Sequence, residues 1–403
     1  MTPCIPPAVC IIVENEPLPR DWRTWQEARA LTQAGYRVSV ICPKAPGYES
    51  SREVQEGIEI YRHALRTASG RLGYVLEYAF ALIAEFWLAC RVFAKTRFSV
   101  LHACNPPDTI FLIALPFKLL GVRFVFDHHD LSPELYDSKF WKRGFLYRIV
   151  CLAERLSFRF ANLCLATNES YREIAITRGN VIPDRVVVVQ SCSELPDLER
   201  DEQKPELKGD KRHLVLYVGV MEPQDGLRLL LESIKYLVKE KRREDTRFVL
   251  VGAGSELHDL KAMATQWALD DSVEFTGFIP HEEVCSYLAA ADVGVSPDPL
   301  NPLNDKSTMA KILEYMAYSL PVVLYDLKEG RRTAGEAALY AHPDDPVDFA
   351  EQVEKLLDSQ SLRQKLGAIG RKRTEQGLNW KAQSEKLVYA YATLFPPARN
   401  GKS

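Results

Sequence analysis

The chain has 403 residues, which is more than one hydrophobic core supports and predicts two or three domains. Its content of 46% hydrophobic and 26% charged residues is typical of a globular protein rather than a disordered one. The formal net charge of −3 excludes the broad basic field of a nucleic-acid-binding protein, so no nucleic-acid partner is expected.

Residues 1–17 have neither the basic start nor the long apolar core of a secretion signal, which predicts a cytoplasmic protein. Nine cysteines are present, and no two of them form a C-x-x-C pair. Most of them stand in apolar runs, so we expect buried thiols in a reducing compartment, without a disulfide framework or a zinc site.

The first half of the chain alternates short apolar runs with helix-like segments. The apolar runs predict buried parallel strands at residues 8–13, 36–43, 57–63, 99–104, 122–127, 161–168 and 184–191. Such an alternation predicts a doubly wound α/β domain, which binds ligands at the carboxyl ends of its strands. Asp21 and Arg23 follow the first strand, where they either meet an anionic ligand or serve as a helix cap and a solvated arginine.

Residues 74–97 form the most apolar helix that the sequence predicts, but Glu77, Glu85 and Arg91 interrupt it. Charged side chains are costly in the centre of a bilayer, so we expect a buried or interfacial helix rather than a membrane span. Its Tyr, Phe and Trp residues also suit peripheral contact with the inner surface of the plasma membrane.

The segment HHDLSPELY leaves the carboxyl end of the strand expected at 122–127. His128, His129, Asp130 and Glu134 therefore stand where the active site of an α/β protein is expected. Structural histidines and a metal-binding pair are the alternatives, although no third metal ligand has a clear spacing.

Residues 194–211 are charged and poor in apolar residues, which marks a linker. A second series of strands and helices follows, and residues 362–394 predict further helices. The whole pattern predicts two doubly wound, Rossmann-like domains that face each other across a cleft suited to a nucleotide or a sugar.

Residues 296–326 combine a polar, Pro-rich loop, a helix expected at 309–318 and a strand expected at 322–325. Three residues of N-cap type precede the helix, namely Asp305, Ser307 and Thr308. A loop that enters a helix N-terminus suits a phosphate or polar hydroxyl groups. Lys311 and Glu314 share one helix face, either as a binding pair for a diphosphate and a diol or as an ordinary salt bridge.

Three common motifs are missing from the sequence. The segment VGAGSE is a short Gly loop without the third glycine and the later acidic residue of a dinucleotide-binding fingerprint. Neither the P-loop pattern G-x-x-x-x-G-K-[ST] nor the hydrolase pattern G-x-S-x-G occurs. A dehydrogenase, a P-loop enzyme and an α/β-hydrolase are therefore disfavoured.

Residues 219–342 resemble the carboxyl-terminal domain of retaining family 4 glycosyltransferases, which have the GT-B fold. The matching pieces are YVG with the Gly226 turn, FVLVGAGSE, VEFTGFIP, ADVGVSPD and the block ending in EYMAYSLPVV. The pieces VFDHHDLSPELY, ATNESY and RDWRTWQEA extend the resemblance over nearly the whole chain. Its block NDKSTMAKILEYMA is most similar to a bacterial subgroup that makes exopolysaccharide, capsule or O-antigen chains.

The resemblance implies that Glu314 binds the ribose hydroxyls of a nucleotide-sugar donor, since a carboxylate accepts two hydrogen bonds from a diol. Lys306 stands where the family has a sugar-binding Glu. The backbone amides of the next residues are therefore expected to hold the sugar, namely those of Ser307, Thr308 and Met309.

Val220 and Asp225 stand where the family has an Arg and a Lys that grip the donor diphosphate. We expect Lys311 to supply the missing charge, with Lys306 and Arg23 as the next candidates.

The remaining site residues also follow from the resemblance. His129, or else His128, is expected beside the donor sugar. The strand that ends at Gly219 borders the donor, and the backbone of one further loop reads the base, at Gly277, Phe278 and Ile279.

The resemblance predicts a metal-independent retaining glycosyltransferase without a cofactor, which moves a sugar from a UDP- or GDP-sugar to a lipid-linked or glycan acceptor. Residues 1–195 would bind the acceptor, 196–211 would form the linker, 212–375 would bind the donor, and 376–403 would pack back on the first domain. Because the usual Arg and Lys are missing, two alternatives stay open. One is a sugar-nucleotide epimerase or phosphorylase of the same fold, and the other is a non-catalytic nucleotide-sugar-binding subunit.

Overall fold

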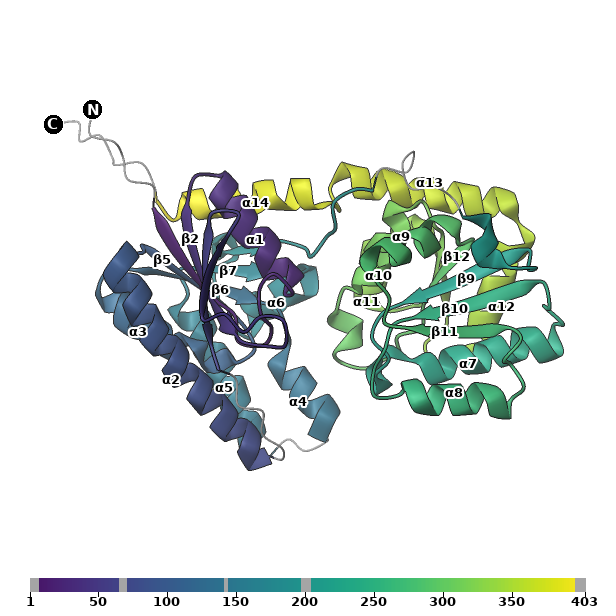
Figure 1. The fold of residues 1–403 in the computed structure, drawn as a ribbon, viewed down its shortest axis with the longest axis horizontal. Helices are drawn as coiled ribbons and strands as arrows, with labels where there is room; N and C mark the ends of the chain where they lie inside the picture. Colours follow the sequence, from purple (N-terminus) through teal and green to yellow (C-terminus); the bar gives the residue numbers. More distant parts are fainter. Residues whose placement is uncertain (1–6, 65–70, 141–143, 197–203, 396–403) are drawn as a thin grey trace. The chain divides into compact units, whose positions relative to one another are not determined.

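The computed structural model describes residues 7–64, 71–140, 144–196 and 204–395 (Figure 1). It divides into two compact units, one made of residues 1–190 with 383–403 and the other of residues 191–382. Each unit has its own mainly parallel sheet with helices on its faces, which confirms the prediction of two doubly wound α/β domains.

The first unit is built on an eight-stranded sheet with the order β3-β4-β2-β1-β5-β6-β7-β8. Its strands are β1 Ala8–Ile12, β2 Arg37–Pro43, β3 Arg52–Gln55, β4 Ile58–His63, β5 Val100–Cys104, β6 Arg123–His128, β7 Leu163–Ala166 and β8 Val186–Val188. All neighbours run parallel except β3 and β4, and the short edge strand β3 was not predicted. The strand order reverses between β1 and β5, which makes their carboxyl ends a switch point where ligands bind in such sheets.

The helices of the first unit are α1 Trp22–Gln33, α2 Arg71–Thr96, α3 Phe111–Leu119, α4 Ser132–Phe140, α5 Phe145–Phe160 and α6 Glu169–Thr177, and most of α14 Trp380–Thr393 belongs to it. Asp21 is the N-cap of α1, where its carboxylate accepts a hydrogen bond from the backbone N–H of Thr24. That contact supports the capping interpretation of Asp21. Helix α4 replaces part of the loop expected after β6.

The second unit contains a parallel six-stranded sheet with the order β11-β10-β9-β12-β13-β14. Its strands are β9 His213–Val218, β10 Thr246–Val251, β11 Val273–Gly277, β12 Val293–Ser296, β13 Val322–Tyr325 and β14 Ala338–Ala341. The order reverses between β9 and β12, so the second switch point lies where Gly219 and the loop after Ser296 begin.

The helices of the second unit are α7 Leu227–Lys235, α8 Leu257–Gln266, α9 His281–Ala290, α10 Ala310–Ala317, α11 Lys328–Ala334, α12 Pro346–Asp358 and α13 Gln360–Gln376. The prediction that Asp305, Ser307 or Thr308 caps α10 is wrong, because the N-cap is Met309 and it makes no side-chain cap bond. The Ser307 hydroxyl instead donates to the Leu303 carbonyl, and the Asp305 carboxylate accepts from the Lys328 N–H. Ser307 is therefore engaged within its own loop, and Asp305 is engaged by a residue of a later segment.

Eight cysteines fall within the described residues, and five of them are buried. Much of the expected linker, at residues 197–203, lies outside the described residues. Among the helices that the structure describes, none has the length and apolar character required to cross a bilayer.

Candidate active site

The carboxyl ends of β9 and β12 bring together two loops of the second unit. The Asn304 side-chain amide donates to the Gln224 carbonyl at 2.9 Å, which ties the loop after β12 to the turn after β9. Gly226 has φ +74°, and a Cβ there would lie 2.0 Å from the Pro297 carbonyl oxygen. Only glycine fits this approach, so the Gly226 turn and the 296–309 loop form one surface.

Lys311 is buried, and its ion-pair partner is Asp298 rather than Glu314. The Lys311 Nζ atom lies 3.0 and 3.3 Å from the two carboxylate oxygens of Asp298, and the Ser296 hydroxyl donates to the same carboxylate. Nζ also lies 4.9 Å from the centre of the Tyr217 ring. The alternative of a Lys311–Glu314 salt bridge is thus wrong, and Asp298 balances the charge of Lys311.

Glu314 has no such partner. Among the residues that the structure describes, none donates a hydrogen bond to its carboxylate. Burial raises the pKa of Glu314 to about 7, and the positive charge of Lys311 opposes that shift. A half-buried carboxylate with unused lone pairs is a site for hydroxyl donors such as those of a diol.

Glycines line the ends of the neighbouring strands. Gly219 has φ +155°, and a Cβ at this position would lie 3.2 Å from the Lys311 Cε atom. The structure therefore brings Gly219 and Lys311 together, although 92 residues separate them in the sequence. The Gly252 N–H donates to the Gly277 carbonyl at 3.0 Å, which sets the start of the 277–279 loop beside β10, and Phe278 in that loop is exposed.

Val220 and Asp225, which stand where the family resemblance expects an Arg and a Lys, supply no positive charge. Val220 is exposed. The Asp225 carboxylate accepts from the Glu222 N–H at 3.0 Å, and burial raises the pKa of Asp225 to about 6. Lys306 ends the 3-10 turn Asn304–Lys306 just before α10.

In the first unit, Arg23 is buried and its guanidinium group is fully engaged. It donates to both carboxylate oxygens of Asp127, at 2.9 and 3.3 Å, and to the Val189 carbonyl at 2.7 Å. It also lies 3.2 Å from the Glu27 carboxylate. Arg23 therefore balances buried acids of its own unit.

The adjacent histidines His128 and His129 have opposite environments. His128 ends β6 and is fully buried, with its ring 4.9 Å from that of Phe158 and 5.1 Å from that of Tyr171. The side chain of His129 is 15% exposed, and its Nε2 atom lies 2.5 Å from an Asp127 carboxylate oxygen. Successive side chains of a strand point to opposite faces, which explains the separation.

Asn105 holds the loop that carries His129. Its side-chain oxygen accepts from the backbone N–H groups of His129 and Asp130, at 2.6 and 3.1 Å. Its side-chain amide donates to the Asp108 carboxylate and to the Asp130 carbonyl. Sequence reasoning missed Asn105, although its place directly after β5 is a signal that points to it.

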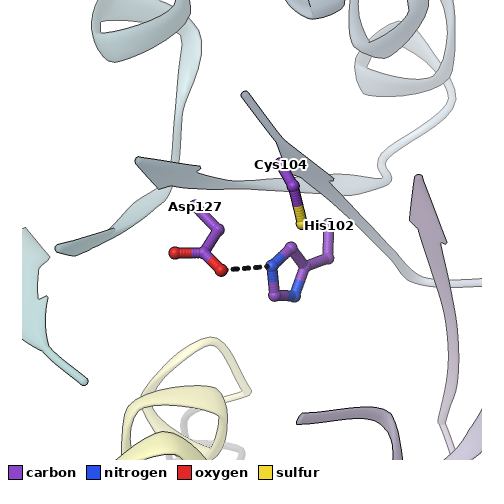
Figure 2. A group of neighbouring side chains, drawn as sticks. All are labelled: His102, Cys104 and Asp127. Carbon is purple, nitrogen blue, oxygen red and sulfur yellow. Dashed lines mark ion pairs between the residues drawn. The ribbon is translucent and has the colours of Figure 1, made fainter. Parts of the chain in front are cut away.

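Two overlapping groups in this region have the side-chain types of a metal site. One consists of His102, Cys104 and Asp127 (Figure 2), and the other of Glu27, Asp127 and His129. Within each group the donor atoms lie within 4.8 Å of one another, and these are the ligand types of Zn²⁺. Asp127 already accepts hydrogen bonds from Arg23 and His129, so the arrangement as it stands is an ionic hydrogen-bond network.

Comparison with known families assigns both units. Residues 21–192 match the glycosyl transferase 4-like domain, and residues 212–359 match the glycosyl transferases group 1 model.

Three curated relatives are similar over different shares of their length. The α-D-kanosaminyltransferase of Streptomyces kanamyceticus is 27% identical over 53% of this chain and 56% of its own length. The 2-deoxystreptamine glucosyltransferase of the same organism is 24% identical over 82% of this chain and 87% of its own. The O-antigen chain mannosyltransferase B of Escherichia coli is 26% identical over 70% of this chain and 72% of its own length.

Solved structures share the fold over almost the whole chain. The sucrose-phosphate synthase of Thermosynechococcus elongatus has a TM-score of 0.77 at 19% identity and covers 96% of this chain and 99% of its own. HepE of Anabaena, solved with UDP and glucose, has a TM-score of 0.72 at 13% identity and covers 96% and 99%.

The fold and the two family matches define this chain as a glycosyltransferase enzyme of the GT-B type. It consists of a glycosyl transferase 4-like domain followed by a group 1 domain.

Proposed function

We propose that this enzyme is a retaining glycosyltransferase, which moves a sugar from a UDP- or GDP-sugar to a lipid-linked or glycan acceptor in cell-surface polysaccharide synthesis. The observation that carries the proposal is Glu314, a half-buried carboxylate to which no described residue donates, on the helix α10 that follows the switch point of the second unit. The UDP in the HepE structure and the name of the E. coli relative, O-antigen chain mannosyltransferase B, support the donor and acceptor classes.

In this proposal the second unit binds the donor. Glu314 accepts hydrogen bonds from the ribose diol, and the 277–279 loop reads the base through its backbone. The sugar lies at the amides of residues 307–309, with Lys306 at its edge and Gly219 below the diphosphate.

The diphosphate needs positive charge, because negative charge grows on the leaving group in the transition state. The N-terminus of α10 supplies a partial charge. Lys311 supplies a full one once the phosphate displaces Asp298 as its partner, a step that costs part of the binding energy.

In the first unit, His129 lies beside the donor sugar and the acceptor binds nearby. His128 is left out of the proposal, because it is fully buried. Arg23 is left out as a phosphate ligand, because its nitrogen atoms already serve Asp127, Glu27 and Val189. No metal or cofactor takes part, and the leaving phosphate itself receives the acceptor proton.

A thermal-shift screen of nucleoside diphosphates and their sugars tests the donor assignment. UDP or GDP is expected to raise the Tm, because a ligand at 100 times its Kd stabilises the folded state by about 2.7 kcal/mol. Adenosine diphosphate is the matched control. If no nucleoside diphosphate raises the Tm at millimolar concentration, the proposed donor class is wrong.

A product assay separates the two remaining alternatives. Consumption of the nucleotide sugar without any acceptor indicates an epimerase, or a phosphorylase if phosphate is required. Nucleotide binding without turnover under any of these conditions indicates a binding subunit.

The acceptor side of the proposal includes peripheral contact with the inner surface of the plasma membrane through α2, α3 and α5. These helices lie together over one face of the first sheet (Figure 1), joined by ring contacts such as Phe86–Phe117 and Phe111–Phe160. The exposed large apolar residues of these helices, together with Leu120 directly after α3, are Phe80, Ile83, Phe86, Trp87, Leu112, Leu119, Leu120, Phe145, Leu146, Ile149 and Leu152.

The charges on these helices favour an anionic surface. The exposed charged residues that the structure describes there are all basic, namely Arg91, Lys95, Arg148, Arg155 and Arg159. Glu85 and Glu154, in contrast, are fully buried. Apolar side chains with a basic fringe are typical of a surface that binds anionic lipid.

We expect Trp87→Glu and Phe145→Glu to abolish co-sedimentation with vesicles that contain an anionic lipid, because each places a negative charge at that surface. Val54→Glu is the matched control, since Val54 on β3 is 62% exposed and Trp87 is 58% exposed. High salt should weaken the wild-type interaction. Unchanged binding of both glutamate variants would contradict the contact.

A further inference from the structure

Three side chains from separate elements link the C-terminal helix to His129. The Tyr391 hydroxyl on α14 lies 2.6 Å from Nδ1 of His102 on β5. Nε2 of His102 lies 3.5 Å from a carboxylate oxygen of Asp127 on β6, and the same oxygen lies 2.5 Å from Nε2 of His129. Figure 2 shows the His102 ring facing Asp127, with Cys104 beside them.

Tyr391, His102 and Asp127 are fully buried, so the interactions among these side chains occur in a region of low dielectric constant. Tyr391 and His102 belong to segments 289 residues apart, and only the return of the chain to the first unit brings them together.

Two buried carboxyl groups face His102, whose Nε2 atom lies 3.5 Å from an oxygen of Asp127 and 3.6 Å from an oxygen of Glu27. Burial alone would raise the pKa of Asp127, but Arg23 and His129 hold it well below its usual range. Burial and the nearby Asp127 raise the pKa of Glu27 well above its usual range, and Arg23 opposes that shift. Burial lowers the pKa of His102, which keeps its ring neutral.

This distribution gives the hydrogen bonds one direction. An ionised Asp127 only accepts, so His129 donates its Nε2–H group to it. His102 turns its Nε2 edge toward the same oxygen at 3.5 Å, an electrostatic contact without hydrogen-bond geometry that favours a proton on Nε2. The Nδ1 atom of the neutral His102 ring is then an acceptor, and the Tyr391 hydroxyl donates to it. His129 consequently presents its Nδ1 edge away from Asp127.

We propose that Asp127, with His102 and Tyr391 behind it, positions the His129 ring by fixing its tautomer and its plane. Asn105 fixes the backbone of the same residue, so His129 is held at two points. The C-terminal helix thereby supports the active site through Tyr391. This inference rests on the proposed place of His129 beside the donor sugar, and the roles of all three residues are positional because none of them reaches the solvent.

Two variants and two readouts test the positioning. Asp127→Asn is expected to shift the His129 ring from the Nε2–H toward the Nδ1–H tautomer, because an amide can donate where the carboxylate accepted. Nitrogen-15 NMR of the ring measures this change. The displaced ring should lower kcat about tenfold to a hundredfold while the Kd of the nucleoside diphosphate stays unchanged.

Tyr391→Phe removes only a hydroxyl group, so it keeps the fold even where Asp127→Asn does not. It should change the ring nitrogen signals of His102 and lower kcat about twofold to fivefold, again with unchanged nucleotide affinity. Cys104→Ala is the matched control, because Cys104 lies in the same buried group but outside the chain. It should leave the His129 signals and kcat as they are.

The outcomes separate this inference from the proposed function. If the wild-type His129 ring carries its proton on Nδ1, or if neither variant alters the ring signals, the positioning chain is overturned even if transfer is intact. If His129→Ala retains full activity while Asp127→Asn still shifts the tautomer, the positioning stands and the catalytic place of His129 fails.

Discussion

Replacing Glu314 by alanine is expected to lower kcat/KM for the donor at least about tenfold, or roughly 1.4 kcal/mol. Among the residues that the structure describes, none donates to this carboxylate, so the ribose diol is its proposed partner. Hydrogen bonds to a charged group contribute about 1.5–3 kcal/mol each, which makes tenfold the lower bound. Donor-saturation kinetics measure the loss of kcat/KM, and calorimetry measures the loss of affinity for the nucleoside diphosphate.

The same residue predicts a pH dependence. Burial raises the pKa of Glu314 to about 7, so the folded protein favours the protonated form below that pH. A diol binds better to the ionised form, and donor affinity should therefore rise about tenfold between pH 6 and pH 8. Glu314→Gln should flatten this rise, whereas Glu336→Gln on the surface should keep it. Wild-type kinetics in both Glu314 variants would contradict the donor site.

Replacing Lys311 by methionine is expected to lower the free energy of unfolding by about 3–5 kcal/mol, because it leaves the buried Asp298 carboxylate without its cation. Urea unfolding measures the effect. Asp298→Asn combined with Lys311→Met should restore most of the stability, since an amide is far less costly to bury than a charge. If the Lys311→Met variant were as stable as the wild type, the Lys311–Asp298 pair would not be buried in solution.

The double variant also isolates the catalytic part of Lys311. If Lys311 neutralises the donor diphosphate, the double variant folds normally but still transfers sugar at least about tenfold more slowly. Full transfer by a stable double variant would assign the phosphate to the α10 N-terminus alone.

The sequence by itself determined the architecture. Buried parallel strands appear as continuous apolar runs and surface helices as periodic ones, and both signals are local. The alternation therefore predicted the two doubly wound units and the position of β12, α10 and β13. The role proposed for Glu314 also came from the sequence, because the block around it is contiguous and similar to a family motif.

Only the tertiary structure decided which side chains are paired. Lys311 and Glu314 share a helix face, yet Lys311 pairs with Asp298, since the folding of one loop places a nearer carboxylate beside it. The adjacent residues His128 and His129 differ in burial because successive side chains at a strand point to opposite faces. The register of β6 was needed to say which of the two is buried.

The residues that hold His129 in place come from segments distant in the sequence, so no local pattern predicts them. Asn105 and Tyr391 reach it through the strand order and through the return of the C-terminal helix to the first unit. A local pattern records which residues a segment buries. The identity of the group that meets each buried polar atom depends on distant segments, and folding alone brings those together.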